Sequence, residues 1–253
     1  MIKADRVVAK YDFRRIRLHI EAPLREGAVV DLNKSQTHYL STVLRLKTND
    51  RVLVFNGRDG EWEAAIELQR RAAVLHVGTK TRAQPEPTDL HYLFAPLKAA
   101  RLDYMIQKAV EMGVSRLQPV LTRHSQVARV NTSRMRANAI EAAEQCGILT
   151  LPEVDEPTTF SHVIAEDDSR RTLIFCDEDA EVANPLAALG SVTPRSPISI
   201  LVGPEGGFAE DERRALLKRP NVVRLTLGPR ILRADTAAVA ALALVQAVLG
   251  DWR

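Results

Sequence analysis

Two glycine loops near the end of the sequence hold the residues best suited to chemistry. One loop, Gly-Pro-Glu-Gly-Gly at 203–207, includes Glu205. The other starts with Gly-Pro-Arg at 228–230 and leads into Arg233. A carboxylate can accept a proton or balance a cation, whereas an arginine stays charged at any working pH. Because glycines also let a ligand approach the backbone, the two loops predict a small-molecule site with charged groups.

Each loop follows a short apolar run and precedes a helical pattern. The runs at 198–202 and 222–227 predict buried strands, and the patterns at 209–219 and 231–249 predict helices. In an open α/β sheet, ligands bind beyond the carboxyl ends of strands, where helix N-termini offer free N–H groups. We therefore expect both loops to leave the same edge of one sheet. Neither loop has the spacing of a dinucleotide fingerprint or a P-loop.

The rest of the second half alternates strands with helices, whereas the first 80 residues read as strands and turns. Strands are expected at 90–95, 116–121 and 172–176, with helices at 98–112 and 132–145, which predicts a parallel sheet covered on both faces. The segment 149–168 has no clear pattern. Before residue 80, strands are expected at 6–9, 15–20, 28–32, 51–55, 62–68 and 72–77, and Asn33 can cap a helix over 34–46. This pattern predicts a small β-barrel or sandwich.

A polar segment with two prolines, 83–89, is the best domain boundary. It separates a first domain, 1–82, from a second, 90–253. At 253 residues and 45% hydrophobic residues, the chain can form packed cores in both. No apolar segment is long enough to span a membrane, and Cys146 and Cys176 lack metal-site spacing. We expect a cytoplasmic protein with free thiols and no bound metal.

Positive charge is concentrated in the first domain. Residues 1–80 carry 15 Lys and Arg against 10 Asp and Glu, although the whole chain has a net charge of only +3. A polyanion is a natural partner for such a domain, although a solvated surface would show the same excess. The cations that we expect to contact the polyanion are Lys3, Arg6, Arg14, Arg17 and Arg45.

The two loops and their flanks also resemble a known family. The segments Leu-Val-Gly-Pro-Glu-Gly-Gly-Phe at 201–208 and Leu-Gly-Pro-Arg-Ile-Leu-Arg-Ala-Asp-Thr-Ala at 227–237 are similar to the C-terminal signature of the ribosomal small-subunit RNA uridine-N3 methyltransferases of the SPOUT superfamily. Residues 107–114 and 141–147 resemble two further motifs of that family, and the first domain resembles its PUA-type barrel. The resemblance implies a C-terminal α/β trefoil-knot domain that forms a homodimer, and an S-adenosylmethionine pocket within the knot.

The resemblance also implies roles for individual residues. The methyl donor would lie in a mostly apolar slot rich in backbone groups, formed by Leu201, Val202, Gly203, Gly206, Thr226, Leu227, Gly228, Ile231, Leu232 and Thr236. Arg233 is the first choice for stabilising an anionic uracil ring, and Glu205 for the base or the partner of the sulfonium. Arg233 could instead brace the loops by pairing with Glu205 or Asp235, and Glu205 could simply complement a helix N-terminus. The Thr236 hydroxyl could cap the last helix.

The substrate implied by the resemblance is 16S ribosomal RNA in the small ribosomal subunit. The basic first domain would dock it through phosphates, and Arg123 and His124 would also contact RNA. These two residues, Ile148 and Asp235 depart from the usual family pattern, so RNA contacts can differ here. Two alternatives remain: a 2′-O-ribose methyltransferase of the same superfamily, whose asparagine-bearing motifs are absent, and a non-catalytic RNA-binding ribosome assembly factor.

Overall fold

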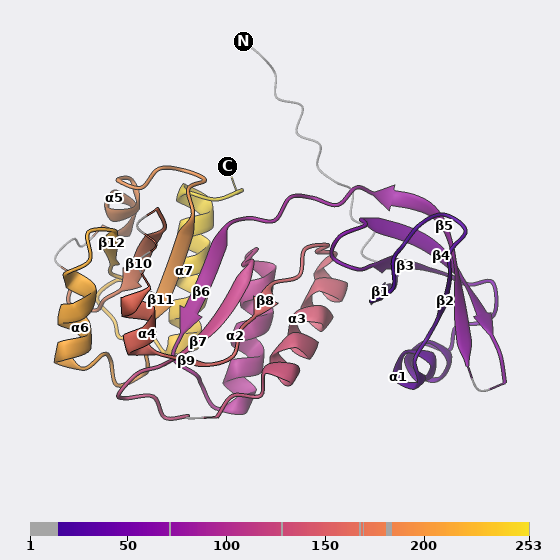
Figure 1. Ribbon diagram of the computed structural model, residues 1–253, viewed down its shortest axis with the longest axis horizontal. Coiled ribbons are helices and arrows are strands. Elements are labelled where there is room, and N and C mark those ends of the chain that lie inside the picture. The colour runs from indigo at the N-terminus through magenta and orange to yellow at the C-terminus, as the bar shows by residue number, and fades with distance from the viewer. Residues whose placement is uncertain are drawn as a thin grey trace, which may run out of the picture. The chain divides into compact units, whose positions relative to one another are not determined.

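The chain forms two compact units in the computed structural model, which describes residues 15–70, 72–127, 129–166, 168, 170–180 and 184–252. One unit comprises Met1–Pro85 with Ala143–Thr150, and the other comprises Glu86–Ala142 with Leu151–Arg253 (Figure 1). The strand expected at 6–9 lies outside the described residues, as do Lys3, Arg6 and Arg14.

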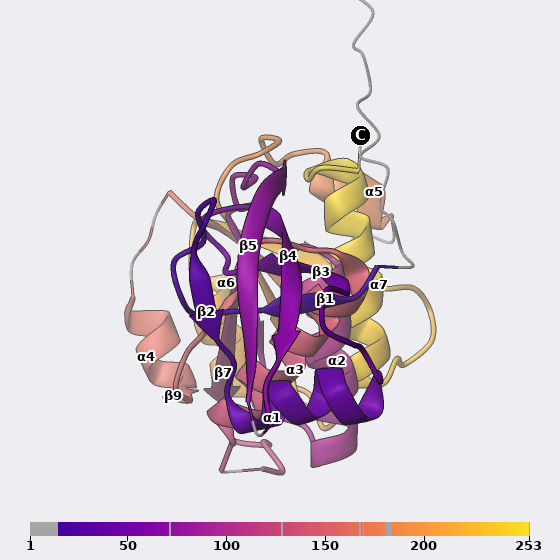
Figure 2. The same ribbon diagram turned by 90° about the vertical axis from the view of Figure 1, so that its right-hand side faces the viewer.

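The first unit is built on a five-stranded sheet in the order β1-β3-β4-β5-β2, seen from the front in Figure 2. Its strands are β1 (Arg17–His19), β2 (Val29–Asp31), β3 (Arg51–Phe55), β4 (Glu61–Leu68) and β5 (Ala73–Arg82). β1 pairs with β3 in parallel, and the other pairs are antiparallel. Alternate apolar side chains of this sheet, with Leu40 of the helical segment, form the core.

The helical segment of this unit begins where the sequence predicts. The Asn33 side chain accepts a hydrogen bond from Gln36 N at 2.9 Å, and the Gln36 side chain accepts one from Asn33 N at 3.1 Å, which forms a capping box. α1 (Lys34–His38) then continues as a turn of π-helix, Tyr39–Val43. The helix ends before the expected residue 46 because Arg45 adopts a left-handed conformation with φ of 54°.

A buried carboxylate, Glu61, ties the first unit together. It accepts hydrogen bonds from Arg17 Nε at 3.0 Å, from Arg82 Nε at 2.9 Å and from Thr81 Oγ1 at 2.9 Å. Burial alone would raise the pKa of Glu61, but the bonds from Arg82 and Thr81 outweigh burial and lower that pKa. Glu61 is therefore ionised at neutral pH and holds the ends of β1, β4 and β5 to one another.

Glu61→Ala should destabilise the first unit by about 3 kcal/mol, because removing one partner of a buried ion pair leaves the other charge poorly compensated. Urea denaturation followed by circular dichroism measures the change in the free energy of unfolding. Glu67→Ala is the matched control: Glu67 lies on the same strand, its side chain is 44% exposed, and the variant should stay within about 0.5 kcal/mol of the parent. Equal stability of the two variants would contradict the assigned role of Glu61.

The second unit contains a parallel sheet in the order β12-β10-β11-β6-β7-β8, with β9 also paired to β7. Its strands are β6 (Leu90–Phe94), β7 (Arg116–Leu121), β8 (Glu153–Val154), β9 (Thr158–Thr159), β10 (Thr172–Cys176), β11 (Ile198–Val202) and β12 (Val222–Leu225). Every residue of β11 is buried, as expected for a parallel strand with both faces covered. The predicted parallel sheet is confirmed.

Among the described residues, six helices that lie wholly or mostly in this unit surround the sheet (Figure 1). They are α2 (Ala99–Glu111), α3 (Thr132–Cys146), α4 (Phe160–Ala165), α5 (Pro185–Leu189), α6 (Glu210–Leu217) and α7 (Ala234–Val248). α4 and α6 pack together over an apolar cluster that includes Phe160, Leu201 and Leu216. α7 packs against α2 and β11. No helix in the described part of the chain is long and apolar enough to cross a membrane.

The structure corrects the sequence predictions at two places in this unit. The segment 149–168, which shows no sequence pattern, contributes β8, β9 and α4. The last helix begins at Ala234 rather than at residue 231, because Arg233 is its N-cap with extended backbone. Thr236 lies inside the first turn and does not cap the helix, so that expectation is wrong. Instead, the Asp235 carboxylate accepts a hydrogen bond from Thr236 N at 3.0 Å.

Candidate functional site

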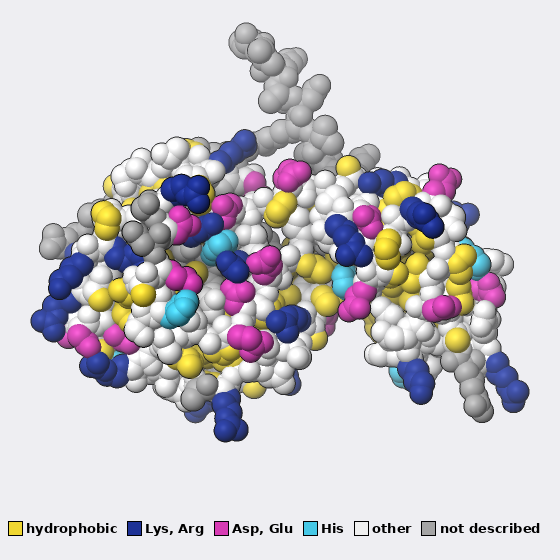
Figure 3. Space-filling view, viewed as in Figure 1, with side chains coloured by type: hydrophobic (Ala, Val, Ile, Leu, Met, Phe, Trp, Pro, Cys, Tyr) yellow, Lys and Arg dark blue, Asp and Glu magenta, His cyan; other side chains and the backbone are white. Residues whose placement is uncertain are grey.

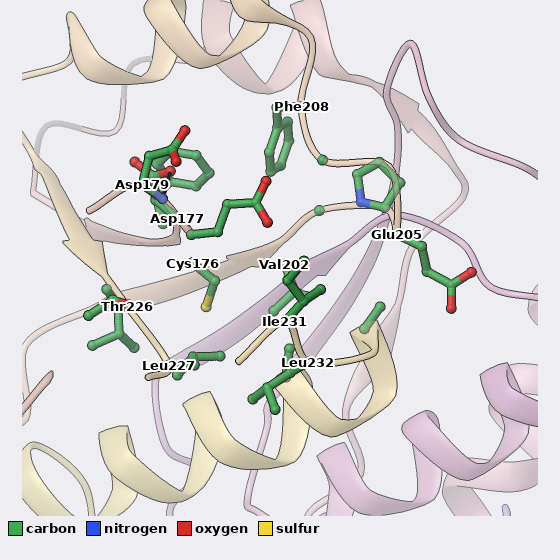
Figure 4. Close-up of a pocket in the computed structure, with 18 of the residues that line it drawn as sticks. Cys176, Asp177, Asp179, Val202, Glu205, Phe208, Thr226, Leu227, Ile231 and Leu232 are labelled. Carbon is green, nitrogen blue, oxygen red and sulfur yellow. Dashed lines mark hydrogen bonds between the residues drawn. The ribbon is translucent and has the colours of Figure 1, made fainter. Parts of the chain in front are cut away.

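A cavity of about 200 Å³ opens at the carboxyl ends of β10, β11 and β12 (Figure 4). Both glycine loops border it, so the expectation that they leave the same edge of one sheet is confirmed. In Figure 4, Ile231 and Leu232 face Val202, while Cys176 and Thr226 lie at the ends of their strands. The cavity thus combines apolar side chains with backbone groups at strand ends, as small-molecule sites generally do.

Most residues expected to bind a ligand line this cavity. They are Val202, Gly203, Glu205, Thr226, Leu227, Gly228, Ile231 and Leu232. Four others do not line it. Leu201 belongs to β11, and its side chain is buried in the apolar cluster with Phe160 and Leu216. Gly206 lies beside His124. Arg233 is exposed just before α7, and Thr236 is exposed on its first turn.

A third wall of the cavity consists of residues that the sequence analysis missed. Phe175, Cys176 and the acidic run at 177–179 line it from the end of β10. β10 lies between β11 and β12 in the sheet, so the loop that follows β10 must reach the same edge. Burial raises the pKa of the Cys176 thiol to about 12, so this cysteine stays neutral and is a poor nucleophile.

The first glycine of the Gly-Pro-Glu-Gly-Gly loop lies against an aromatic ring. A Cβ atom at Gly203 would stand 2.4 Å from Phe208 Cε2, much closer than carbon atoms can approach. Phe208 is held by edge-on packing against Phe175, with ring centroids 5.2 Å apart, and by Phe160. At Gly206, by contrast, a Cβ would meet nothing closer than 3.6 Å. Only the first of these two glycines is required by packing.

Arg233 does not form an ion pair with Glu205 or Asp235, which was one of the two roles considered for it from the sequence. Glu205 forms an ion pair with Arg101 of α2. The hydrogen bond from Arg101 lowers the pKa of Glu205, so the carboxylate is an anion and a weak base at neutral pH. Its side chain turns away from the centre of the cavity in Figure 4. The Arg233 guanidinium makes no hydrogen bond or ion pair with any described residue.

A buried ion-pair network supports the acidic wall. Asp177, 5% exposed, accepts hydrogen bonds from Arg213 Nη2 at 3.1 Å and from Arg224 Nε at 2.8 Å. Burial raises the pKa of Asp177, but the bonds from Arg213 and Arg224 outweigh burial and lower it overall. Arg224 also donates to the backbone carbonyl of Asp179. The network therefore joins the loop after β10 to α6 and β12.

The cations expected to contact RNA differ in their surroundings. Arg45 is exposed, whereas Arg17 is 6% exposed and paired with Glu61, so Arg17 is a structural cation and not a surface contact. Arg123 pairs with Asp211 and keeps 61% of its side chain exposed. His124 Nδ1 lies 3.2 Å from the carbonyl oxygen of Gly207. Arg123 and His124 thus lie beside the first glycine loop.

Comparisons with known proteins agree with this architecture. Residues 84–246 match the model of the RNA methyltransferase domain, and residues 32–77 match the RNA methyltransferase PUA domain. The chain is 32% identical over 232 residues to the ribosomal RNA small subunit methyltransferase E of Rickettsia conorii, covering 91% of this chain and 94% of the relative. It is 28% identical to the protein of that name from Buchnera aphidicola subsp. Acyrthosiphon pisum, covering 94% and 95%.

A solved structure has the same fold over nearly the whole chain. The ribosomal RNA small subunit methyltransferase E of Neisseria gonorrhoeae, bound to S-adenosyl methionine, superposes with a TM-score of 0.85 at 29% identity and covers 94% of this chain and 100% of its own. The second unit accordingly has the SPOUT α/β trefoil-knot fold and the first is a PUA-like domain. The chain belongs to the RNA methyltransferase family of the small-subunit methyltransferases E.

Proposed function

We propose that the protein transfers the methyl group of S-adenosylmethionine to N3 of one uridine in 16S ribosomal RNA. The observation that carries this proposal is the cavity at the three strand ends, with Arg233, which pairs with none of the described residues, close to it. The relatives named for small-subunit ribosomal RNA methylation, and the Neisseria protein bound to S-adenosyl methionine, support the substrate and the donor. No metal is required, since the donor supplies an electrophilic methyl group on a sulfonium.

The cavity residues fit such a donor. Val202, Leu227, Ile231 and Leu232 offer apolar contacts for an adenine ring, and the backbone of both loops offers hydrogen bonds to its edge. The carboxylates of the acidic wall suit the hydroxyl groups and the positive charges of the donor. Gly206 and Thr236 lie outside this set.

Arg233 is the residue that we assign to the reaction itself. Uracil N3 becomes a good nucleophile only when its proton leaves, and the resulting negative charge spreads over the ring carbonyl oxygens. A guanidinium near those oxygens would stabilise the charge as it develops. Because Arg233 has no partner among the described residues, no existing ion pair must break first. Glu205, fixed as an anion by Arg101, is better suited to balance the sulfonium than to remove a proton.

The RNA and the quaternary structure form the rest of the proposal. The first domain, with boundaries near 1–82 and a linker near 83–89, would dock ribosomal RNA in the small subunit, with Arg45 among its contacts. Arg123 and His124 would contact RNA near the first glycine loop. We also propose a homodimer through the knotted domain, which analytical ultracentrifugation would test directly.

Gly203→Ala and Gly206→Ala test the donor site as a matched pair in one loop. Gly203→Ala should weaken binding of S-adenosylmethionine and lower stability by about 1–3 kcal/mol, since its Cβ would displace the Phe208 ring. Gly206→Ala should leave both quantities near those of the parent. Isothermal titration calorimetry and thermal unfolding measure the two effects. Parent-like donor binding by Gly203→Ala would count against this site.

The product identifies the reaction. Labelled S-adenosylmethionine is incubated with small subunits that lack the modification and with naked 16S RNA, and nucleosides are then analysed by mass spectrometry. We expect 3-methyluridine, formed more efficiently on the subunit than on naked RNA. A 2′-O-methylnucleoside would overturn the N3 assignment, and donor binding without any product would favour an assembly factor.

A further inference from the structure

The helical segment of the first unit, residues 34–43, lies across one end of the five-stranded sheet (Figure 2). Its inner side is in the core, where Leu40 is fully buried, whereas Tyr39 is 40% exposed and Val43 is 58% exposed. Leu44 N donates to the Tyr39 carbonyl oxygen at 2.9 Å, the spacing of a π-helix, so Tyr39 and Val43 lie about one turn apart. The segment therefore presents an apolar face that no described residue covers.

The segment ends at an arginine in a conformation that favours glycine. Arg45 has a left-handed backbone with φ of 54°, and Leu46 N then donates to the Leu40 carbonyl oxygen at 3.0 Å. Glycine is the usual residue at such a helix end, because the Cβ atom of any other residue crowds a carbonyl oxygen. The Arg45 side chain is exposed and makes no hydrogen bond or ion pair with any described residue. What the arginine adds over glycine is thus a free guanidinium beside the apolar face.

Positive charge surrounds this face. Residues 32–49 contain Lys34, Arg45 and Lys47 but no aspartate or glutamate. All three side chains are exposed, and none forms an ion pair with a described residue. Figure 3 shows basic and histidine side chains at the lower end of the first unit, where Figure 1 draws α1. The face therefore fits a partner that is anionic and also has an apolar surface.

An unpaired nucleotide of RNA has both properties. Its phosphate is anionic, and its unstacked base offers a flat surface that stacks on aromatic side chains. A duplex would meet the cations but leave Tyr39 and Val43 without contact, because its bases are stacked on one another. Arg45 follows Val43 by two residues, at most about 7 Å along the chain, so one nucleotide can reach both.

We propose that this face binds one unpaired nucleotide of the RNA substrate, with the base stacked on Tyr39 and Val43 and the phosphate held by Arg45. The inference rests on the proposed RNA substrate but not on which atom of that RNA is methylated. It assigns to the first unit the recognition of a single-stranded segment in folded ribosomal RNA, beyond the general attraction of its cations for phosphates.

Binding of two RNA probes to the full chain, measured by fluorescence anisotropy, tests the stacking contact. One probe is a short single strand of adenosine and cytidine, which lacks the uridine that the second unit would bind, and the other is that strand paired with its complement. Tyr39→Ala should weaken binding of the single strand about tenfold, as for the loss of one stacked base, and leave duplex binding unchanged. Tyr39→Phe keeps the ring and should bind as the parent does.

Arg45→Gly separates a ligand contact from a structural role. The variant should resist urea at least as well as the parent, because glycine suits the left-handed backbone. Its binding of the single strand should be weaker, and the slope of log Kd against log salt should fall by about 0.7, the value for one phosphate contact on a single strand. Arg25→Gln is the control, since Arg25 is exposed and precedes β2 whereas α1 follows it, and this variant should bind as the parent does.

Three results would overturn the inference: single-strand binding by Tyr39→Ala that equals the parent's, equal losses of single-strand and duplex binding in that variant, or an Arg45→Gly protein that unfolds at lower urea than the parent. The proposed function can fail separately. Methylation of an atom other than uridine N3, with the expected binding results, would revise the reaction and support the nucleotide contact at Tyr39 and Arg45.

Discussion

Arg233→Ala should lower the single-turnover rate of methyl transfer by about 100- to 1000-fold, the usual effect of removing one group that stabilises a developing negative charge. The affinity for S-adenosylmethionine should change little, because Arg233 does not line the donor cavity. Rapid-quench assays on the small subunit, with enzyme in excess, measure the rate without product release. Calorimetry measures donor affinity separately.

Two further substitutions make this result specific. Arg233→Lys keeps the positive charge but loses the planar fork, so we expect an intermediate rate. Arg214→Ala removes an exposed arginine of α6 that, within the described part of the chain, pairs only with Glu210, at 3.9 Å. The rate of this variant should match that of the parent. If Arg233→Ala methylates at the normal rate with unchanged donor affinity, the stabilising cation must be sought elsewhere in the site.

The glycine loops were predictable because each depends on neighbouring residues in the sequence. A buried strand, a glycine turn and a helix follow one another within about twenty residues, and parallel pairing then brings both loops to one edge. The strands Arg116–Leu121, Thr172–Cys176 and Ile198–Val202 match their predicted ranges. The fold class follows from the same alternation, whereas the knot came only from the family resemblance.

The contacts that were not predicted join residues far apart in the chain. Arg101 and Glu205 are 104 positions apart, and nothing local to either indicates their ion pair. The charge count likewise assigned Arg17 to the surface, because composition cannot show which cations are neutralised by a buried carboxylate such as Glu61. The acidic wall, by contrast, was predictable. Ligands bind beyond the carboxyl ends of parallel strands, and residues 177–179 directly follow the predicted strand at 172–176.

Asp177→Ala should have the largest effect on stability of any single change near the donor cavity. Asp177 is buried between Arg213 and Arg224, and its removal leaves two arginines at 22% and 26% side-chain exposure without their shared carboxylate. We expect a loss of about 3 kcal/mol in the free energy of unfolding. Donor binding should weaken as well, because the loop after β10 loses its anchor. Urea denaturation and calorimetry measure the two losses.

Asp179→Ala is the control for this change, since Asp179 lies in the same loop with its side chain 73% exposed. Its stability should fall by no more than about 0.5 kcal/mol. Similar losses in both variants would show that the loop, and not the buried carboxylate, determines stability.

The pH dependence gives an independent test of the Asp177 charge. Because its pKa is lower in the folded than in the unfolded protein, ionised Asp177 contributes its full stability above the ordinary aspartate pKa. That contribution is lost as the pH falls through the lowered folded pKa. The difference in stability between the parent and Asp177→Asn should therefore be constant near neutrality and shrink in acid. A difference that stays constant into strong acid would mean that the amide disrupts packing, and that the ion pairs with Arg213 and Arg224 contribute little.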